Sequence, residues 1–479
     1  MKKTPSLPAY DRTALTPGIV HIGLGNFHRA HMAVYLDDLF ALGGDHDWAI
    51  LGAGVREGDA RMRDALMGHD CLSTVITLDP VQGTSARRVG AMTGFIPVQA
   101  DNAALIAAMC DPAIRIVSMT VTEGGYFVDA QGVFDPAHPD IAHDAAHPGA
   151  PRTAFGAILA ALRARRGTGV APFTVMSCDN LPGNGHVTRG TICGLARLQD
   201  AAFASWVEVN VAFPNGMVDR ITPATGLRER ALAAEYGLDD SVPVTCEPFR
   251  QWVLEDNFPT GRPALEKVGV TFTPHVHAYE AMKIRILNGG HAVIAYPSAL
   301  LDLTLVHEAM ADPLIHAFLE RVERVEILPF VPPVPETDIG SYIDLIMDRF
   351  SNPHIADTTA RLCLDGSNRQ PKFIVPSLRD NLAAGKLPRG LILPSALWCH
   401  YCAGVTESGV VIPPNDPDWE NLQTRARAAV GDAQAWLGMT AVYGDLGGDA
   451  GFVAEFTRQL ALIGAKGVRV AVQAYLDGK

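Results

Sequence analysis

Residues 19–31 read IVHIGLGNFHRAH, and this stretch decides the fold class of the chain. Ile19 to Ile22 have the largely apolar character of a buried parallel strand, and an apolar helix follows the turn at Gly23 and Gly25. A strand, a glycine turn and a helix in this order are typical of a dinucleotide site, where the pyrophosphate lies at the helix N-terminus. His28 stands where the third glycine of G-x-G-x-x-G is expected. A glycine turn of some other α/β protein therefore stays an open alternative.

A second predicted strand, Trp48 to Val55, leads to two acidic residues, Glu57 and Asp59. An acidic side chain at this point of a dinucleotide-binding fold accepts hydrogen bonds from the adenosine ribose. The pattern therefore favours NAD over NADP. Arg56 lies beside them and could instead bind a 2′-phosphate.

Three further strands are predicted, and polar residues follow two of them. Ile114 to Val121 precedes Glu123, and Phe173 to Ser177 precedes Asn180. Ligands of open α/β sheets gather at the carboxyl ends of the strands, so both residues are site candidates. Capping of the next segment explains them equally well. The third strand is predicted at Val207 to Phe213, before the loop that contains Asp219 and Arg220.

A segment with the residue types of an alcohol-oxidising site begins at Tyr279 and reads YEAMKIRILNGGH. In one α-helix, Glu280, Lys283, Asn288 and His291 fall within about 140° of arc. A buried lysine is pushed towards its neutral form, which is a competent general base. An asparagine amide can donate to a developing alkoxide, and an imidazole can orient a hydroxyl. The alternative is a purely structural helix, in which the lysine pairs with Glu280 and the histidine is a core residue.

Composition limits the function classes. The chain has 479 residues, 48% of them apolar, and a net charge of −13, which argues against nucleic acids and anionic membranes as partners. The N-terminus has two lysines but no apolar core, so no signal peptide is expected, and no apolar run reaches the length of a membrane span. The eight cysteines are scattered, which fits a reducing cytoplasm. No long heptad seam is evident, so a monomer is favoured.

The hydrophobic pattern changes near residue 275, where strand-like runs give way to helical periods. We therefore predict an α/β Rossmann-type domain at residues 1–275 that binds NAD. A mostly α-helical domain at residues 276–479 is expected to carry the substrate and catalytic residues.

Six segments together resemble the polyol-specific long-chain dehydrogenase/reductase family. They read GLGNFHRAH (23–31), TEGGY (122–126), SCDNL (177–181), FPNGMVDRITP (213–223), KIRILNGGH (283–291) and DGSNRQP (365–371). The resemblance spans most of the chain and keeps the family's order. It implies an active site between the two domains and metal-independent hydride transfer between a secondary alcohol and a nicotinamide cofactor.

The resemblance also implies roles for individual residues. Lys283 would be the general base, Asn180 and Asn288 would hold the alcohol oxygen, and His291 would orient substrate hydroxyls. Asp219, Arg361 and Arg369 would bind the substrate, although many relatives carry lysine at position 369, and Glu280 would relay the proton to solvent. The residues expected to bind the cofactor are Gly23, Gly25, Asn26, Phe27, Glu57, Asp59 and Glu123.

The function expected from these observations is NAD-dependent oxidation of a polyol to a ketose without a metal. Mannitol to fructose is the default pair, and arabinitol, sorbitol or altritol are alternatives. A fructuronate or tagaturonate reductase of the same family is the runner-up, since Arg361 or Arg369 could bind a carboxylate. A catalytically silent dinucleotide-binding regulator is the alternative from a different class.

Overall fold

The computed structural model describes residues 4–129 and 132–479, except for the side chain of Glu123. The chain forms two compact units, Met1–His277 and Ala278–Lys479, which are described separately below. All eight cysteines are free. Among the described residues, no helix combines the length and the apolar character needed to cross a bilayer.

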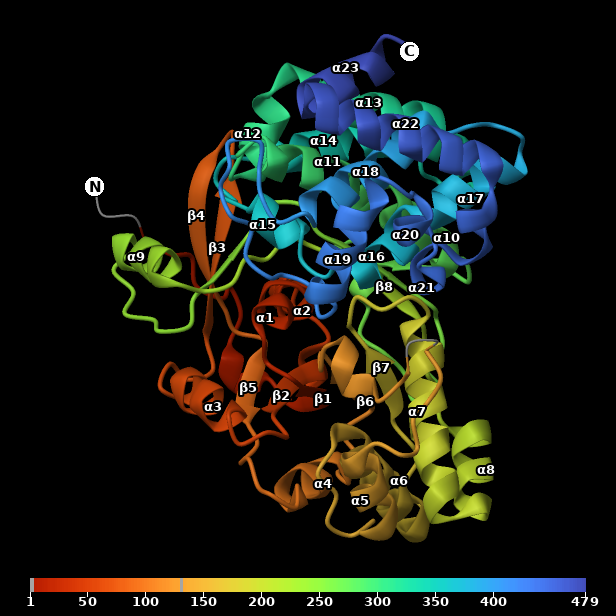
Figure 1. Cartoon of the computed structure of the whole chain (residues 1–479). Helices are drawn as coiled ribbons and strands as arrows, with labels where there is room; N and C mark the ends of the chain where they lie inside the picture. Colours follow the sequence, from red (N-terminus) through yellow and green to blue (C-terminus); the bar gives the residue numbers. More distant parts are fainter. Residues whose placement is uncertain (1–3, 130–131) are drawn as a thin grey trace. The chain divides into compact units, whose positions relative to one another are not determined.

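A five-stranded parallel sheet forms the centre of the first unit, with the order β5-β2-β1-β6-β7 (Figure 1). Its strands are β1 (Pro17–Ile22), β2 (Ala49–Ala53), β5 (Met92–Phe95), β6 (Ile116–Met119) and β7 (Thr174–Ser177). Parallel strands all begin at the same end of the sheet, so the chain must cross back to that end after each strand, usually through a helix. The helices are α1 (Asn26–Ala30), α2 (Met32–Ala41), α3 (Asp59–Met67), α4 (Ala103–Met109), α5 (Pro139–Ala146), α6 (Ala154–Thr168), α7 (Asn184–Gln199), α8 (Ala201–Asn210) and α9 (Leu227–Glu235).

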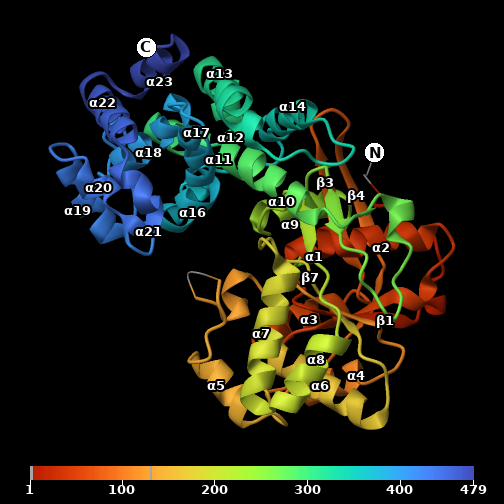
Figure 2. The same cartoon turned by 90° about the vertical axis from the view of Figure 1, so that its right-hand side faces the viewer.

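Both faces of this sheet are buried. Successive strand side chains point to opposite faces, so Ile19 of β1 packs in one core with α2, and Val20 packs in another core with α4, α6 and α7. Helices α7 and α8 lie side by side at one edge of the unit (Figure 2). This arrangement leaves the carboxyl ends of β1, β2, β6 and β7 as the edge where loops can hold a ligand.

Two small sheets complete the first unit. One has the order β11-β10-β8, and the other has the order β4-β3-β9. Their strands are β3 (Ser73–Asp79), β4 (Gly83–Val89), β8 (Gly216–Asp219), β9 (Val244–Cys246), β10 (Gln251–Leu254) and β11 (Thr271–Phe272). Strands β8 and β10 pair antiparallel, with Asp219 opposite Gln251.

The strand predicted at Val207 to Phe213 is wrong. Residues 201–210 form helix α8, and only the residues after Asn210 are extended. The Asp200 carboxylate caps this helix by accepting from the backbone N–H of Ala202 (2.8 Å) and Phe203 (3.1 Å). Phe203 and Val207 lie one turn apart and are both buried, so capping and helical spacing outweigh the strand preference of the valines.

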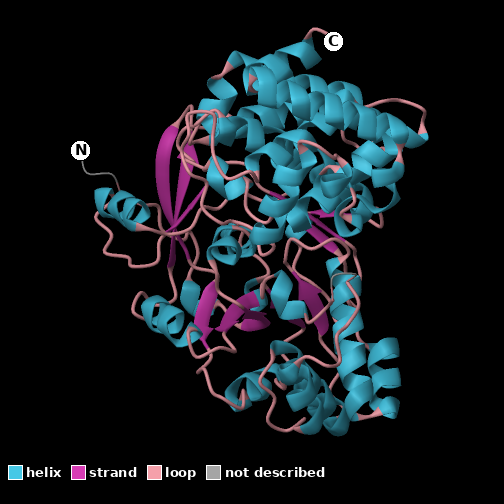
Figure 3. Ribbon diagram, viewed as in Figure 1, coloured by secondary structure: helices cyan, strands magenta, loops and turns pink. Residues whose placement is uncertain are grey.

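The second unit is helical throughout its named elements (Figure 3). Its α- and π-helices are α10 (Val276–Met282), a π-helix (Lys283–Asn288), α11 (Gly289–Leu300), α12 (Val306–Ala311), α13 (Pro313–Val322), a second π-helix (Glu323–Ile327), α14 (Ile339–Phe350), α15 (Thr359–Leu362), α16 (Gly366–Phe373), α17 (Val375–Ala383), α18 (Arg389–Tyr401), α19 (Trp419–Ala429), α20 (Gln434–Leu437), α21 (Thr440–Tyr443), α22 (Ala450–Lys466) and α23 (Val468–Leu476). An α/β unit followed by a helical unit is the predicted fold class, which is confirmed.

Candidate active site

The glycine turn after β1 has the geometry that a dinucleotide site requires. Gly23 has φ +96°, and a Cβ there would lie 2.1 Å from the carbonyl oxygen of Thr120. Only glycine fits this position. Gly25 precedes α1, and a Cβ on it would meet no atom within 4 Å. The space above Gly25 is therefore open to a ligand.

A cavity of about 460 Å³ lies at this turn. It is lined by residues that follow β1, β2 and β6, among them Gly23, Gly25, Asp59 and Thr122, and by Arg152 from before α6. Cavities of this size and position hold ligands in open α/β folds. The structure thus places a ligand-sized space where the sequence pattern predicts the cofactor.

The two predicted ribose ligands differ in position. Asp59 lines the cavity, and its Oδ2 accepts from the backbone N–H of Val55 (3.0 Å) and Arg56 (2.9 Å). Among the described residues, no backbone N–H donates to its Oδ1. Glu57 is exposed and does not line this cavity, whereas Arg56 does. Glu123 lies in the turn after β6, and its side chain is outside the described part of the structure.

Asn26 and Phe27 support the turn from beside the cavity. The Asn26 amide donates to the Pro223 carbonyl (3.0 Å) and the Thr225 hydroxyl (2.9 Å), and it accepts from Arg29 (2.8 Å). Phe27 stacks on His31 with ring centroids 4.8 Å apart. Neither side chain lines this cavity, so these contacts give both a positioning role, and direct cofactor contact stays a prediction.

Three buried histidines lie next to the glycine turn, and the sequence pattern assigned them no role. His21 contacts the Ser118 (2.7 Å) and Thr120 (3.1 Å) hydroxyls, and His28 stacks on it with ring centroids 3.5 Å apart. Burial lowers the pKa of His21 and His31 to about 3, and that of His28 well below its usual value. All three rings are therefore neutral near pH 7.

These histidines predict an acid-sensitive first unit. Their folded-state pKa values lie below the unfolded value of about 6.5, so the unfolded chain binds more protons as pH falls below that value. The free energy of unfolding should fall by up to about 1.4 kcal/mol per pH unit for each histidine. The change in stability can be measured by hydrogen exchange of the β1 amides at pH 7.5 and 5.5, corrected for intrinsic exchange rates. Equal protection at both values contradicts the prediction, and His28→Leu should flatten the dependence.

A carboxylate at the end of β7 organises the loop after β6. Asp179 accepts from the backbone N–H of Val121 (2.9 Å) and Thr122 (3.1 Å) and from the Tyr126 hydroxyl (2.7 Å). Thr122 has φ +66°, which is strained for a β-branched residue and typical of functional sites. Asn180, the next residue, is exposed at the carboxyl end of β7. Its position therefore matches the predicted edge of the sheet.

The predicted catalytic segment of the second unit is one continuous helical stretch with a π-helix inside it. Lys283 begins the π-helix, Asn288 ends it, and His291 lies in the first turn of α11. The even 100° spacing expected for a single α-helix does not hold, because π-helical turns are wider; such turns are frequent at functional sites. Glu280 and Lys283 are both buried, with 7% and 6% of their surface exposed.

Two glycines let other elements approach this helix closely. A Cβ on Gly290 would lie 2.4 Å from the Glu323 carboxyl, and one on Gly289 would lie 3.3 Å from the Phe373 carbonyl. The helix does not bend out at these glycines but continues as α11. Their small size therefore serves packing against the second π-helix and α16.

Two polar atoms of this segment are buried with no hydrogen-bond partner among the described residues: Asn288 Oδ1 and His291 Nε2. The His291 ring stacks on Phe350, with centroids 4.0 Å apart and planes 11° apart. Burial, with a smaller effect of the Arg361 charge, lowers the pKa of His291 to about 3. Unpaired buried polar atoms are costly and point to a ligand that completes them.

The two predicted substrate arginines lie near His291 but are engaged by neighbours. Arg361 pairs with Asp357 through two hydrogen bonds, one of 2.6 Å from Nε. Arg369 donates to the backbone carbonyls of Arg361 (3.0 Å) and Leu362 (3.2 Å). Asp357 is the functional candidate that sequence reasoning missed, although its i,i+4 spacing to Arg361 is visible in the sequence. Asp219 ends β8 and is buried, with 4% exposed.

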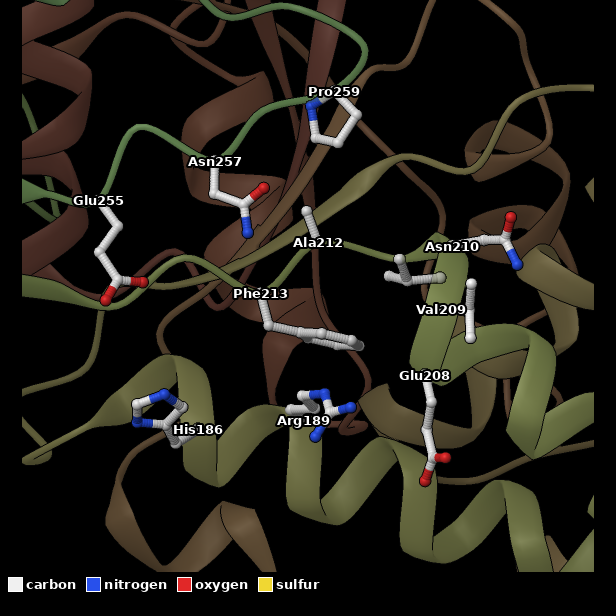
Figure 4. A pocket seen from close by; sticks show the side chains of 11 residues that line it. His186, Arg189, Glu208, Val209, Asn210, Ala212, Phe213, Glu255, Asn257 and Pro259 are labelled. Carbon is white, nitrogen blue, oxygen red and sulfur yellow. The ribbon is translucent and has the colours of Figure 1, made fainter. Parts of the chain in front are cut away.

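A second cavity of about 430 Å³ in the first unit lies between α7, the end of α8 and residues 255–259 (Figure 4). Its acidic groups are engaged: Glu255 accepts from the Asn215 backbone (2.8 Å) and amide (3.0 Å), and Glu208 pairs with Arg197. We therefore assign no chemistry to it. Among the residues that the structure describes, no three His, Cys, Asp or Glu side chains are grouped to hold a metal ion.

Comparison with known proteins identifies the family. The mannitol dehydrogenase Rossmann domain matches residues 17–267, and the mannitol dehydrogenase C-terminal domain matches residues 275–463. The chain belongs to the mannitol dehydrogenase family. Membership confirms the resemblance and the prediction of a polyol dehydrogenase.

Individual relatives of this family cover the whole chain. Mannitol 2-dehydrogenase of Cereibacter sphaeroides is 71% identical over 476 residues, covering 99% of this chain and 100% of that protein. The structure of Pseudomonas fluorescens mannitol 2-dehydrogenase, a ternary complex with NAD and D-mannitol, is 42% identical with a TM-score of 0.88, covering 99% of this chain and 97% of that one. D-Sorbitol dehydrogenase in substrate-free form is 34% identical with a TM-score of 0.90, covering 98% and 97%.

Proposed function

We propose that this member of the mannitol dehydrogenase family oxidises mannitol to fructose with NAD and without a metal ion. The observation that carries the proposal is the 71% identity to a mannitol 2-dehydrogenase over nearly the full length of both chains. The solved relative with NAD and D-mannitol supports the same cofactor and substrate. We propose further that the first unit binds NAD and that the second carries the base. A cytoplasmic location and a monomeric state stay predictions.

The cavity of the first unit fits NAD. The open space at Gly25 suits the pyrophosphate, and the Asp59 carboxylate, whose Oδ1 accepts from no backbone N–H of the described residues, suits the adenosine ribose. NAD, when bound, accepts the hydride from the alcohol carbon. Glu57 and Glu123 stay predicted ligands of the same cofactor.

The two glycines of the turn allow a sharp test. Gly25→Ala should weaken NADH binding about tenfold or more with little change in Tm, because its methyl group occupies the space for the pyrophosphate. Gly23→Ala should instead lower stability by about 1–3 kcal/mol, since both φ and the Thr120 carbonyl exclude a side chain. NADH fluorescence titration and thermal unfolding of both variants measure this. An unchanged Kd in Gly25→Ala would remove the pyrophosphate from this turn.

In the proposed reaction, Lys283 takes the proton of the substrate hydroxyl as the hydride leaves the carbon. A neutral amine is needed for this step, and a buried site disfavours the ammonium form. The amides of Asn288 and Asn180 stabilise the negative charge that develops on the alcohol oxygen. They thereby take the role that a Lewis-acidic metal has in other alcohol oxidations. Glu280 passes the proton from Lys283 towards solvent.

His291 binds a substrate hydroxyl in this proposal. Its ring is neutral, Phe350 fixes its plane, and Nε2 is a buried atom that a hydroxyl can satisfy. Asp219, Arg361 and Arg369 bind the distal hydroxyls. The Asp219 carboxylate can accept a hydrogen bond from a hydroxyl, and the guanidinium groups of Arg361 and Arg369 can donate to one.

The arginine environment favours a neutral polyol over a sugar acid. Asp357 already neutralises Arg361 through a bidentate pair, and Arg369 is held by two carbonyl oxygens. A uronate carboxylate would have to compete with Asp357 for the guanidinium group. We therefore place fructuronate and tagaturonate reduction second.

The test is NADH formation with mannitol, sorbitol, arabinitol, altritol, mannonate and altronate, each with NAD and with NADP. We expect the highest kcat/KM for mannitol with NAD. Turnover of the aldonates alone would replace the proposal with uronate metabolism. Silence with every substrate while NADH still binds would favour the regulator.

A further inference from the structure

The histidine that stands in place of the third glycine of the dinucleotide fingerprint has a partner in the preceding strand. The His28 ring stacks on the His21 ring with centroids 3.5 Å apart, and both side chains are buried. The stack joins α1 to β1, which is the close helix–strand contact that the third glycine ordinarily allows. His21 is therefore part of the structure that supports the glycine turn.

The hydrogen bonds of His21 define its tautomer. The Thr120 hydroxyl donates to the Gly23 carbonyl (2.5 Å), so its oxygen accepts from Nε2 of His21 (3.1 Å). Burial lowers the pKa of His21 to about 3, and the Gly23 carbonyl opposes this effect in part, as expected for an N–H that faces it. A neutral imidazole carries one N–H, which leaves Nδ1 to accept from the Ser118 hydroxyl (2.7 Å).

A single chain of hydrogen bonds therefore runs from Ser118 through the His21 ring and the Thr120 hydroxyl to the Gly23 carbonyl. Thr120 directly follows β6, and its backbone N–H also donates to the Ile22 carbonyl (2.9 Å). Two consecutive carbonyls at the end of β1 are thus held by one residue. These bonds fix the plane of the peptide group that follows Gly23.

The orientation of this peptide group decides which atom the turn offers to a ligand. The C=O and N–H of a trans peptide point in opposite directions, and no described peptide bond is cis. Since the Gly23 carbonyl points to Thr120, the N–H of Leu24 points away from it. Among the described residues, no backbone carbonyl accepts from this N–H, and Leu24 lines the cavity at the turn. A backbone N–H there is a suitable donor to a phosphate oxygen.

We propose that His21 is a positioning residue for the cofactor: through the Thr120 hydroxyl it fixes the Gly23 carbonyl and thereby directs the Leu24 N–H to the pyrophosphate. Fixing the donor before binding lowers the cost of ordering it when the cofactor binds. Thr120 lines the cavity, whereas His21 does not, so His21 acts on the cofactor only through its neighbours. This inference rests on the proposed function, in which NAD binds at the glycine turn.

Removing either member of the link should weaken NADH binding by a similar factor. His21→Leu and Thr120→Val should each raise the Kd of NADH about tenfold, as expected for one lost hydrogen bond. The KM for NAD should rise in parallel, with kcat at saturating NAD within about twofold of the wild type, since the link contributes to binding rather than to the chemical step. A lower kcat with an unchanged Kd would overturn the proposal.

The double variant separates a link from two independent packing roles. Effects that pass through one hydrogen-bonded chain are not additive, so His21→Leu combined with Thr120→Val should bind NADH about as well as either single variant. A Kd raised by the product of the two factors would overturn the proposal. Thr120→Val keeps the β-branched shape, so it tests the link even if His21→Leu does not fold.

His21→Gln is the conservative variant. Its amide can place an N–H group near the position of Nε2, so it should recover part of the affinity that His21→Leu loses. Both variants remove the ring that stacks on His28, so the comparison isolates the hydrogen bond from the stacking. Equal Kd values in the two variants would show that packing alone matters and would overturn the proposal.

Thr174→Val is the matched control for Thr120→Val. Thr174 begins β7 in the same sheet, is 1% exposed, and has a hydroxyl with no hydrogen-bond partner among the described residues. It does not line the cavity, so this variant should bind NADH like the wild type. Weakening equal to that of Thr120→Val would assign the effect to the sheet as a whole and overturn the role of the link.

Gly25→Ala distinguishes a failure of this inference from a failure of the proposed cofactor site. Weaker NADH binding in Gly25→Ala with unchanged binding in His21→Leu would overturn only the role of His21. Unchanged binding in both variants would remove the cofactor from the turn and overturn both proposals. Fluorescence titration of the full chain with NADH measures the Kd values, and thermal unfolding verifies that each variant is folded.

Discussion

The Lys283→Ala variant is expected to lose turnover of mannitol by about 10²- to 10⁴-fold, the usual contribution of a general base. Lys283 begins the π-helix and is buried, with 6% exposed. No other lysine lies in the segment from Tyr279 to His291. NADH affinity should stay near the wild-type value, since the cofactor cavity belongs to residues of the first unit. Steady-state kinetics and NADH fluorescence titration measure the two quantities.

A structural role of Lys283 can be separated from a chemical one. Lys283→Met keeps most of the side-chain volume and should be equally inactive, whereas a packing role would be largely preserved by methionine. A small primary amine added to Lys283→Ala should restore part of the rate. Lys466→Ala, at the exposed end of α22, is the control and should be fully active. A loss of NADH binding rather than of turnover would place Lys283 in the cofactor site.

Local sequence patterns were sufficient to predict elements whose structure depends mainly on residues close together in the chain. The apolar run before Gly23 predicted β1, because a buried parallel strand needs little more than that pattern and a turn. The valines between residues 207 and 211 misled the same reasoning. There the Asp200 cap and the spacing of Phe203 and Val207 produce a helix. Strand preference depends on which neighbour a residue packs against, and the sequence does not state the neighbour.

Other features depend on contacts that are distant in the chain. The sequence gives Asn288 and His291 the right types for the site, but it does not show that Asn288 Oδ1 and His291 Nε2 are buried and unpaired. Close packing at Gly290 involves Glu323, more than thirty residues away. The Arg361–Asp357 pair is local, and its spacing is visible in the sequence, but the bidentate contact that turns the arginine from a free cation into half of a neutral pair is seen only in the structure.

The second large effect is expected for Asn288→Ala, in which kcat should fall about 10²- to 10³-fold, as for loss of one oxyanion donor. KM for mannitol should change much less, because the amide interacts most strongly with the oxygen once it carries negative charge. Stability should change little or even rise, since the variant removes a buried oxygen that has no hydrogen-bond partner among the described residues. Stopped-flow NADH formation and thermal unfolding measure these effects.

This combination of results separates catalysis from packing at Asn288. A side chain that only packs would lose stability when truncated, with kcat nearly unchanged. A side chain that only binds ground-state substrate would raise KM and leave kcat unchanged. Asn421→Ala, on the exposed face of α19, controls for loss of an asparagine elsewhere in the same unit. An unchanged kcat in Asn288→Ala would remove this residue from the oxyanion site and leave Asn180 as the remaining amide candidate.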